Sequence, residues 1–526
     1  MSLPSTIAQV MWAAGNLPSA VRFARALKEP EQVQTAWLTR RLRADADSAF
    51  GQEHDFGAIR SYRDFANRVP LRDWSGFSPW IDRIRTGERG VLGMEPVSHL
   101  APTSGSSGAR KLIPFTPTLH RAFADAVGAW MSDLTRLEPG ILRGPAYWSI
   151  SPMADEESGE VPIGFADDAE YLGGWKAGLV RHLMTVPAGI RHERDVEKFW
   201  LRTAGGLLAR RDLRLISIWH PSFLGLILEA AAKHWSVILD GLENRRAAEL
   251  RRIGPENPAD WWPGLRVLSC WGDLAAEPGM REIARQFPRC RVQPKGLLAT
   301  EAAVTIPWRG RFPLTVTSHF FEFLTDSGDL LAAHQLVRGM TYEVIVTNGG
   351  GLWRYRLGDR VECDGFSGIT PTLRFLGRAG NVSDLCGEKL SEPFVADCLA
   401  ELWPGGAGRP TAAYLRPVRF ENGNPAYLLA VDRAVDHALA DRLDHLLCRN
   451  PHYDLARRLG QLQAPGIHID SSSGPPGCEA DTRRLGDVKP LVLDPRCADL
   501  FTARKPSPKP WRTDKLVAAP GGRRSP

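Results

Sequence analysis

The stretch that most suggests chemistry is "APTSGSSGARKLIPF", which runs from Ala101 to Phe115. It gathers small and hydroxyl residues and ends them with Arg110 and Lys111. Glycines free backbone N–H groups and serines supply hydroxyls, and these donors can converge on the oxygens of a phosphate. The Walker A order, Gly-Lys followed by Ser or Thr, is absent. Taken alone, the stretch is either a phosphate-binding loop or a flexible linker.

Three other stretches carry residue types suited to the same chemistry. In "KGLLATEAAV", Thr300 and Glu301 end an apolar run, where a hydroxyl and a carboxylate can hold a metal-bound triphosphate. In "GGLWRYRLGDRVEC", Asp359 follows Gly358 at a predicted strand end, where a carboxylate can accept hydrogen bonds from ribose hydroxyls. In "RRLGDVKPLVL", Lys489 lies in a turn. Each has an ordinary alternative: a chance dipeptide, a solvated turn aspartate and a surface lysine.

The elements that would position these residues follow from the hydrophobic pattern. Residues 213–220 and 265–273 look like buried strands, whereas residues 221–242 and 279–288 have helical spacing. This alternation predicts an α/β fold with a largely parallel sheet. The β-rich runs between residues 312 and 365 predict an antiparallel sheet or barrel that closes the main domain.

The chain also shows where it divides. A turn-rich break at "FLGRAGNVSDLCGEKLSE" separates the β-rich region from a small α+β unit with two strands around Asn422-Gly423-Asn424. We predict a large N-terminal domain over residues 1–377, a hinge over 378–384, a small C-terminal domain over 385–501 and a disordered basic tail over 502–526. The first hundred residues look largely helical, with a helix broken at Asn16-Leu17-Pro18.

Charge and composition narrow the class of protein. The formal net charge of the 526 residues is +6, and the tail alone carries seven basic residues against one acid, so the rest of the chain is close to neutral. A neutral body disfavours a nucleic-acid-binding domain. No apolar stretch is long enough to span a membrane, and eight scattered cysteines without a C-x-x-C pair suggest reduced thiols. We expect a monomeric cytoplasmic protein without nucleic-acid or membrane partners.

The four stretches, in this order, resemble the adenylate-forming superfamily of acyl-CoA synthetases and luciferases. "TSGSSGARK" matches the superfamily pattern Thr-Ser-Gly-[ST]-[ST]-Gly-x-x-Lys at every defined position. More narrowly, "YRLGD", "GLLATE", "SPMADEESGEVPIGFADDAEYLGG" and "GDVKP" resemble the Gretchen Hagen family of acyl acid–amido synthetases. The resemblance covers nearly the whole chain, to about residue 494.

This resemblance implies a fold and a reaction. The expected fold is a large N-terminal domain of α/β sheets with a β-barrel-like subdomain, followed by a small mobile α+β C-terminal domain. The expected reaction is ATP-dependent activation of a small-molecule carboxylic acid to acyl-AMP with release of pyrophosphate, then transfer to an amine, in particular an amino acid. Two alternatives stay open: an acyl-CoA synthetase that uses coenzyme A as acceptor, and a non-catalytic acid- or nucleotide-binding protein.

The resemblance also assigns residues to roles. ATP phosphates would be bound by Thr103, Ser104, Gly105, Ser106, Ser107 and Gly108, with Lys111 as a charge support. Thr300 would bind the α-phosphate, Glu301 would hold Mg²⁺, and Lys489 would reach into the site from the small domain; these three are the expected catalytic residues. The wall around adenine and ribose would be formed by Trp271, Gly272, Asp273, Tyr355 and Asp359, with Arg378 at the hinge. Two departures stand out: Leu297 replaces a common aromatic residue, and Asp487 replaces a common glutamine.

Overall fold

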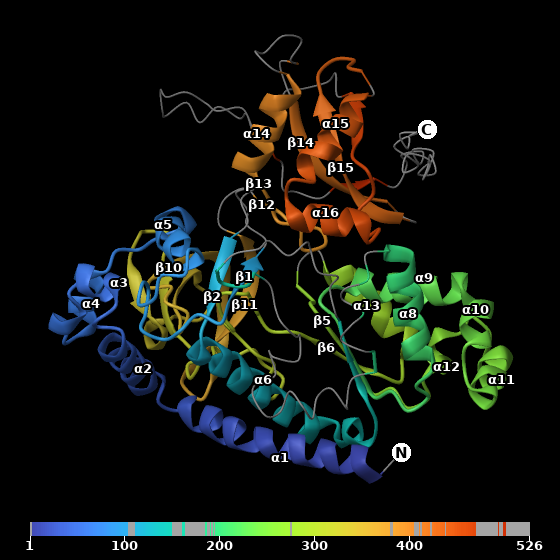
Figure 1. Cartoon of the computed structure of the whole chain (residues 1–526), viewed down its shortest axis with the longest axis horizontal. Coiled ribbons are helices and arrows are strands. Elements are labelled where there is room, and N and C mark those ends of the chain that lie inside the picture. The colour runs from blue at the N-terminus through green and yellow to red at the C-terminus, as the bar shows by residue number, and fades with distance from the viewer. Residues whose placement is uncertain are drawn as a thin grey trace, which may run out of the picture.

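The structure is a computed structural model of the whole chain, shown in Figure 1. The residues that it describes are 3–103, 111–149, 160–163, 185–186, 190, 193, 195–273, 276–378, 382–403, 410, 413–420, 423–436, 438–469, 493 and 498–500. Figure 1 shows the C-terminal elements above two lobes, with two long helices along the opposite side.

A four-stranded parallel sheet forms the centre of one lobe, in the order β3-β4-β5-β6. Its strands are β3 (Ala146–Trp148), β4 (Leu215–Ser217), β5 (Val267–Cys270) and β6 (Arg291–Pro294). Alternate side chains face opposite sides: Leu215 and Val267 join the hydrophobic cluster that includes α6, whereas Ile216 and Leu268 join the cluster of α8 and α9. The two strands predicted from the sequence are therefore confirmed, as is the α/β class.

The helices of this lobe begin where the sequence supplies a cap. The Thr116 side chain accepts a hydrogen bond from the N–H of Leu119 (3.2 Å) at the start of α6, and Asp195 accepts from the N–H of Lys198 (3.1 Å) at the start of α8. The helices are α6 (Pro117–Leu137), α8 (Val196–Leu208), α9 (Pro221–Lys233), α10 (Trp235–Asp240), α11 (Asn244–Ile253), α12 (Pro258–Trp261) and α13 (Glu277–Gln286).

A five-stranded antiparallel sheet forms the other lobe, in the order β11-β10-β9-β7-β8. Its strands are β7 (Phe320–Leu324), β8 (Leu330–Ala332), β9 (Thr341–Thr347), β10 (Tyr355–Ser367) and β11 (Thr370–Arg378). Beside it, β1 (His99–Thr103) and β2 (Lys111–Phe115) form an antiparallel pair. Within the described strands this sheet keeps β8 and β11 as edges, so of the two predicted forms it is a sheet rather than a closed barrel.

The N-terminal helices cover this lobe and the base of the molecule. They are α1 (Leu3–Ala26), α2 (Pro30–Ala44), α3 (Ala49–Glu53), α4 (Tyr62–Arg68) and α5 (Trp74–Arg85). The predicted break at residues 16–18 is wrong, because α1 continues through Pro18. Its neighbour Ser19 donates a hydrogen bond to Asp125 of α6 (2.8 Å), and Gly128 leaves room for Asn16. This docking along α6 holds the helix together where proline removes a backbone donor.

The C-terminal elements build a hydrophobic cluster of their own, which includes Phe394, Leu415 and Tyr453. A four-stranded sheet in the order β16-β15-β14-β17 is joined by a short antiparallel pair, β12 and β13. The elements are β12 (Val382–Ser383), β13 (Leu390–Ser391), α14 (Glu392–Leu402), β14 (Ala413–Phe420), β15 (Gly423–Val431), α15 (Ala438–Leu447), α16 (Pro451–Arg458), β16 (Gly466–Ile469) and β17 (Ala498–Leu500). The predicted domain bounds stay a prediction, and the tail 502–526 lies outside the described residues.

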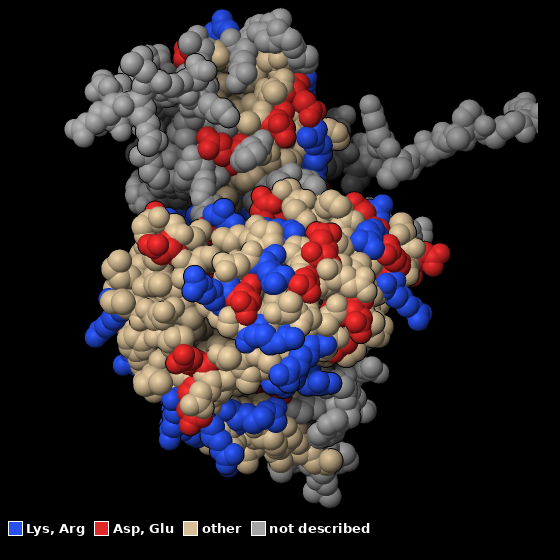
Figure 2. Space-filling model, turned by 90° about the vertical axis from the view of Figure 1, so that its left-hand side faces the viewer, with Lys and Arg blue, Asp and Glu red and all other residues tan. Residues whose placement is uncertain are grey.

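The described residues also bear on the expectations for membrane spans, disulfides and surface charge. No helix in the described parts of the chain combines the length and the apolar content that crossing a membrane requires. The six cysteines within those parts, Cys270, Cys290, Cys363, Cys386, Cys398 and Cys448, form no disulfide. On the face shown in Figure 2, acidic and basic side chains are both spread over the surface.

One buried ion pair ties the helices to the antiparallel sheet. The guanidinium of Arg354 donates to both carboxylate oxygens of Glu322 on β7, at 2.9 and 2.8 Å, and both side chains are at most 3% exposed. Arg354 Nη1 also donates to the carbonyl oxygens of Val69 (2.6 Å) and Ala66 (2.9 Å) at the end of α4. The segment that leads into β10 is thus fixed on two sides.

We expect Glu322→Ala to lower the free energy of unfolding by about 3–5 kcal/mol, because it leaves the Arg354 charge buried without its partner. Asp326→Ala is the matched control, since it removes an exposed pair with Arg360 in the same sheet (2.8 Å) and should cost less than about 1 kcal/mol. Urea titrations monitored by tryptophan fluorescence measure both. Equal losses in the two variants would contradict the structural role of the Arg354 pair.

Candidate active site

An ion pair between the neighbouring strands β10 and β11 lies at the centre of the site. Asp359 and Arg378 are cross-strand partners, and Arg378 Nε lies 3.0 Å from Asp359 Oδ1. The Asp359 side chain is 3% exposed and that of Arg378 13%. Arg378 Nη1 also donates to the carbonyl oxygen of Leu357 (3.1 Å). The pair is therefore both hydrogen-bonded and largely removed from water.

The local backbone of β10 explains how Asp359 is directed. The predicted strand end is wrong: β10 runs from Tyr355 to Ser367, and Asp359 lies inside it. The pairing with β9 shifts register between Arg356 and Arg360, and Gly358 has a φ of +77° within this irregular stretch. Such a bulge redirects a side chain without ending the strand. The sequence shows Gly358, but a glycine is typical both of a bulge within a strand and of a strand end, so it does not distinguish the two.

Glu301 is held next to the same two strands by the turn between β9 and β10. Its side chain is buried, and its carbonyl oxygen accepts a hydrogen bond from Asn348 Nδ2 (2.7 Å). The Asn348 Oδ1 in turn accepts from the N–H groups of Gly350 (2.9 Å) and Leu352 (3.1 Å). Thr300, the preceding residue, is half-buried. The predicted Thr-Glu pair is thus fixed to the antiparallel sheet.

The ends of the opening loop reach the same place. Thr103 ends β1 and pairs with Lys111, which begins β2, so the two residues that flank the predicted loop lie side by side. Lys111 Nζ donates to the hydroxyl of Tyr355 at 3.4 Å. Burial lowers the pKa of Lys111, whereas the charge of Glu301 acts to raise it. The predicted phosphate-binding residues Ser104, Gly105, Ser106, Ser107 and Gly108 lie outside the described residues.

Lys389 is a site residue that the sequence reasoning missed. It lies between β12 and β13 with a φ of +48°. Burial lowers its pKa and the nearby Arg378 lowers it further, whereas Asp384, Asp359 and Glu301 act in the opposite direction. A lone lysine in the glycine-containing turn "CGEKLSE" was a usable signal, of the same kind that pointed to Lys489. Lys489 itself lies outside the described residues.

Glu388 fixes the loop that presents Lys389. Its carboxylate accepts hydrogen bonds from the N–H groups of Leu385 and Cys386, both at 2.7 Å, and from the hydroxyl of Tyr427. Asn450 Nδ2 donates to its carbonyl oxygen (3.0 Å). Burial, helped by the charge of Asp384, raises the pKa of Glu388 to about 7. The C-terminal elements therefore hold this lysine on a rigid support.

Opposing effects act on the ionised form of the Asp359 carboxylate: burial destabilises it, and two nearby cations stabilise it. Burial raises its pKa, and the charges of Arg378 and Lys389 oppose that effect. Burial also raises the pKa of Tyr355 well above its usual value, with Glu301 adding to the shift. Three cations and two carboxylates thus share one buried region: Lys111, Arg378, Lys389, Glu301 and Asp359.

The three residues predicted to contact adenine follow β5 at the carboxyl edge of the parallel sheet. The Trp271 ring meets Phe375 of β11 edge-on, at 5.4 Å between ring centroids, so it lies beside the strand that carries Arg378. A side chain at Gly272 would collide with Met280. Burial raises the pKa of Asp273 to about 6, against the charge of Arg374. Leu297 is buried and offers no exposed face for stacking.

The donor set suits magnesium bound together with phosphates. The described residues contain no cluster of three or more histidine, cysteine, aspartate or glutamate side chains that could hold a metal ion by themselves. Mg²⁺ is usually held by one or two carboxylates plus substrate phosphates. Glu301, a buried carboxylate near enough to Lys111 to affect its pKa, fits that requirement.

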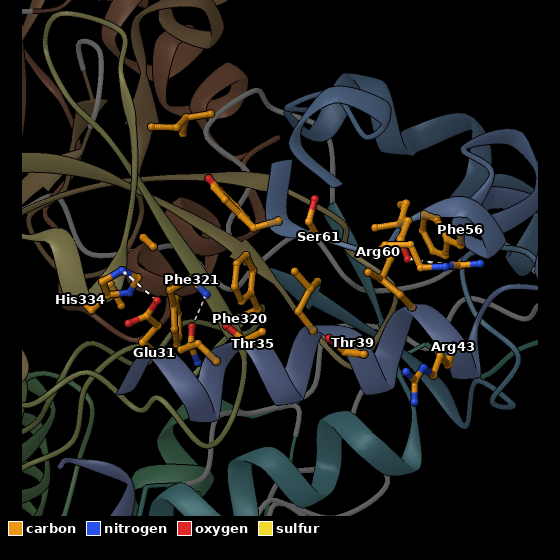
Figure 3. A pocket seen from close by; sticks show the side chains of 18 of the residues that line it. Glu31, Thr35, Thr39, Arg43, Phe56, Arg60, Ser61, Phe320, Phe321 and His334 are labelled. Atoms are coloured by element: carbon orange, nitrogen blue, oxygen red, sulfur yellow. Dashed lines mark hydrogen bonds and ion pairs between the residues drawn. The ribbon is translucent and has the colours of Figure 1, made fainter. Parts of the chain in front are cut away.

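A cavity of about 740 Å³ lies apart from this region, and none of the predicted site residues lines it (Figure 3). It lies between α2, residues 56–62 and strands β7 and β8. Figure 3 shows Glu31 paired with His334 (3.7 Å) at one end and Arg43 and Arg60 toward the other. The buried charges, rather than this cavity, mark the candidate active site.

Comparison with known proteins gives consistent matches. The model of the GH3 family N-terminal domain matches residues 20–256, and that of the GH3 family central domain matches residues 312–378. A putative indole-3-acetic acid-amido synthetase, GH3.10 of Oryza sativa subsp. japonica, is 22% identical over 427 residues, which cover 74% of this chain and 84% of that protein. Indole-3-acetic acid-amido synthetase GH3.4 of Arabidopsis thaliana is 21% identical and covers 69% and 70%.

A solved structure has a similar fold. The GH3.15 acyl acid amido synthetase superposes with a TM-score of 0.61 at 15% sequence identity, covering 85% of this chain and 87% of that chain. This likeness shows that the chain shares its fold with that protein and confirms the predicted α/β class.

We expect Arg378→Met to destabilise the protein more at pH 7.5 than at pH 5. Without the guanidinium, the pKa of the buried Asp359 rises further above its unfolded value, so stability falls as pH rises and the carboxylate must ionise unpaired. Thermal midpoints of the variant and wild type at the two pH values measure the difference. Arg360→Met, which removes the exposed pair between Arg360 of β10 and Asp326, should show no comparable pH dependence. A pH-independent loss in Arg378→Met would contradict the burial of an ionised pair.

Proposed function

Because the chain belongs to the GH3 family, we propose that it is an ATP-dependent ligase that activates a carboxylic acid to acyl-AMP, releases pyrophosphate and joins the acyl group to an amino acid. The observation that carries the proposal is the shared buried region of Lys111, Glu301, Asp359, Arg378 and Lys389. The amido synthetase names of the relatives support the amide product.

Different residues of the chain would bind the phosphates, the ribose and the adenine of ATP. Thr103 and the following loop would bind phosphates, Thr300 the α-phosphate, and Asp359 the ribose hydroxyls through the carboxylate oxygen that Arg378 leaves available. Trp271, Gly272 and Asp273 would lie against adenine, and Tyr355 would shape the ribose wall. Glu301 would hold Mg²⁺, which supplies positive charge against the phosphates.

The first step of the proposed reaction brings two negatively charged groups together. A substrate carboxylate approaches an anionic phosphorus centre, so fixed donors have to offset the negative charge that grows in the transition state. Lys111, Arg378 and Lys389 supply three positive charges around Glu301. Because the loop of Glu388 holds Lys389 in place, this donor costs little reorganisation when the reaction starts.

The second step would require the C-terminal elements to move. We propose the division into residues 1–377, a hinge at 378–384 and residues 385–501, with the tail 502–526 outside the catalytic unit. In the described arrangement Gln461 Nε2 donates to Ser222 Oγ at the start of α9 (2.9 Å), and Leu459 joins the cluster of the parallel sheet. Such a limited contact suits a unit that swings to admit the amine. Lys489 would enter the site in one of the two orientations.

The reaction is tested by pyrophosphate release with Mg·ATP and pooled carboxylic acids, followed by hydroxylamine, amino acids or coenzyme A as acceptors. We expect acid-dependent pyrophosphate release and an amide product with an amino acid. A product formed only with coenzyme A would favour the acyl-CoA synthetase alternative. ATP binding without pyrophosphate release for any acid would favour a binding protein.

The two lysines can be separated by their half-reactions. We expect Lys389→Ala to lower acid-dependent pyrophosphate release by about a hundredfold, because it removes a charged donor fixed in the described orientation. Lys489→Ala should also slow this step and still convert supplied acyl-AMP to amide. Lys233→Ala, an exposed lysine on α9, is the matched control and should leave both steps unchanged. Normal pyrophosphate release by Lys389→Ala would exclude it from the first half-reaction.

A further inference from the structure

A buried lysine surrounded by tryptophans lies at the carboxyl edge of the parallel sheet. Lys295 directly follows β6 and is 5% exposed. Its Nζ lies 4.6 Å from the ring centroid of Trp219, 5.8 Å from that of Trp148 and 5.9 Å from that of Trp130. Trp148 ends β3, Trp219 lies just beyond β4, and Trp130 comes from α6. Three separate elements thus converge on one ammonium group.

The strand register places a row of mostly polar side chains next to the tryptophan cage, which consists of Trp130, Trp148 and Trp219 around Lys295. Trp148, Ser217, Ser269 and Gln293 are paired across the four strands and lie on the face that packs against α6. Gln293 accepts a hydrogen bond from the indole of Trp130 (2.9 Å). The hydroxyls of Ser217 and Ser269 are buried, and neither has a hydrogen-bond partner among the described residues. The carboxyl edge of such a sheet is where α/β folds bind ligands.

The charge of Lys295 is not balanced by the described protein. Burial lowers the pKa of Lys295 to about 7, and its one ionisable neighbour in this part of the chain is the thiol of Cys270. Burial raises the pKa of that thiol to about 12, so it stays neutral. Stacked aromatic rings offset only part of the cost of burying an ammonium, which ordinarily also has acceptors for its N–H groups. None of the described residues accepts a hydrogen bond from it.

One wall of the cage is open to a ligand. Trp219 is 51% exposed although its ring lies next to a buried cation. A flat group that covered this ring would remove apolar surface from water and bring its substituents toward Lys295.

Lys295 is electrostatically separate from the nucleotide cluster. The charges of Glu301, Asp359, Arg378 and Lys389 influence one another, but none of them acts on the pKa of Lys295. The two regions are nevertheless connected, because Trp271 donates a backbone hydrogen bond to the carbonyl oxygen of Trp219 (2.9 Å). A substrate that reaches both would place its reacting carboxylate at one and its far end at the other.

We propose that Lys295 and its three tryptophans select an aromatic carboxylic acid that carries a second oxygen substituent, a ring carboxylate or hydroxyl, away from the carboxylate that is activated. The ring stacks on Trp219, and the second oxygen accepts a hydrogen bond from the Lys295 ammonium. This inference rests on the proposed function, since it names the acid of the same reaction.

Matched acids test the proposal: 3-phenylpropanoate, its 4-hydroxy form and its 4-carboxy form. Binding is measured by calorimetry in the presence of α,β-methylene ATP and Mg²⁺, and turnover by pyrophosphate release. For the wild-type protein we expect at least one substituted acid to bind about tenfold or more tightly than the unsubstituted acid. Lys295→Met should weaken that acid by about ten- to hundredfold and change the unsubstituted acid by less than about threefold.

Two controls keep the result interpretable. Lys233→Met, an exposed lysine on α9, should leave every acid unchanged. The thermal stabilisation by Mg·ATP reports that Lys295→Met is folded with an intact nucleotide site; if it is not folded, Lys295→Arg replaces it and should retain the preference. Trp219→Leu should weaken all three acids to a similar extent.

The outcomes separate this inference from the proposed function. Binding of a substituted acid that depends on Lys295, without pyrophosphate release, would support the inference and contradict the ligase. Pyrophosphate release without a preference for substituted acids, or a preference that survives in Lys295→Met, would overturn the inference alone. An equal loss for substituted and unsubstituted acids would also overturn it, because Lys295 would then hold the reacting carboxylate.

Discussion

The ion pair between Asp359 and Arg378 is the constraint around which the candidate site is organised. A carboxylate that is 3% exposed is costly to keep ionised, and a cation at 3.0 Å is the direct compensation. The pair needs two adjacent strands in a fixed register, a bulge at Gly358 that directs the aspartate, and a strand that ends at the arginine. Arg378 is also the last residue of β11, after which the chain leaves for the C-terminal elements. One interaction therefore fixes both the proposed ribose side of the site and the point at which the chain leaves the antiparallel sheet.

The charged forms of the two lysines around this pair are destabilised by their surroundings. Burial lowers the pKa values of Lys111 and Lys389, and the charge of Arg378 lowers both further. An anion placed among them reverses that penalty, because each positive charge then gains a partner. If the C-terminal elements move as proposed, polyphosphate binding and the described position of the Lys389 loop would be coupled: whatever brings Lys389 into the region would favour the anion, and the anion would favour that position. Because Glu388 is hydrogen-bonded to Tyr427 and Asn450, any movement of the C-terminal elements would carry the Lys389 loop with it.

The sequence predicted which residues gather in one site more completely than it predicted the local backbone around them. The resemblance of the ordered motifs to a known family placed Thr103, Lys111, Glu301 and Asp359 in one site, and the structure brings the charges of Lys111, Glu301 and Asp359 together. Short apolar runs predicted the strands β4 and β5, because a buried strand is marked by its own residues. Pro18 and Asp359 were misplaced because contacts between α1 and α6, and a bulge between β9 and β10, decide the local backbone. Lys389 and Lys295 were missed because a buried lysine differs from a surface lysine only through its tertiary surroundings.

In the function that we propose, the parallel and the antiparallel sheet would recognise different substrates. The antiparallel sheet carries the charged groups that suit a polyanion, and the parallel sheet carries tryptophans, buried hydroxyls and a single cation that suit an aromatic acid with a second oxygen substituent. The segment from Lys295 to Glu301 joins them in seven residues, and Asn348 fixes its far end to the antiparallel sheet (2.7 Å). Because this segment is anchored at both ends, the distance between the two regions is set by the fold rather than by either ligand. In the proposed reaction, an acid of the right length would therefore have its carboxylate aligned before the reaction begins, which would lower the entropic part of the barrier.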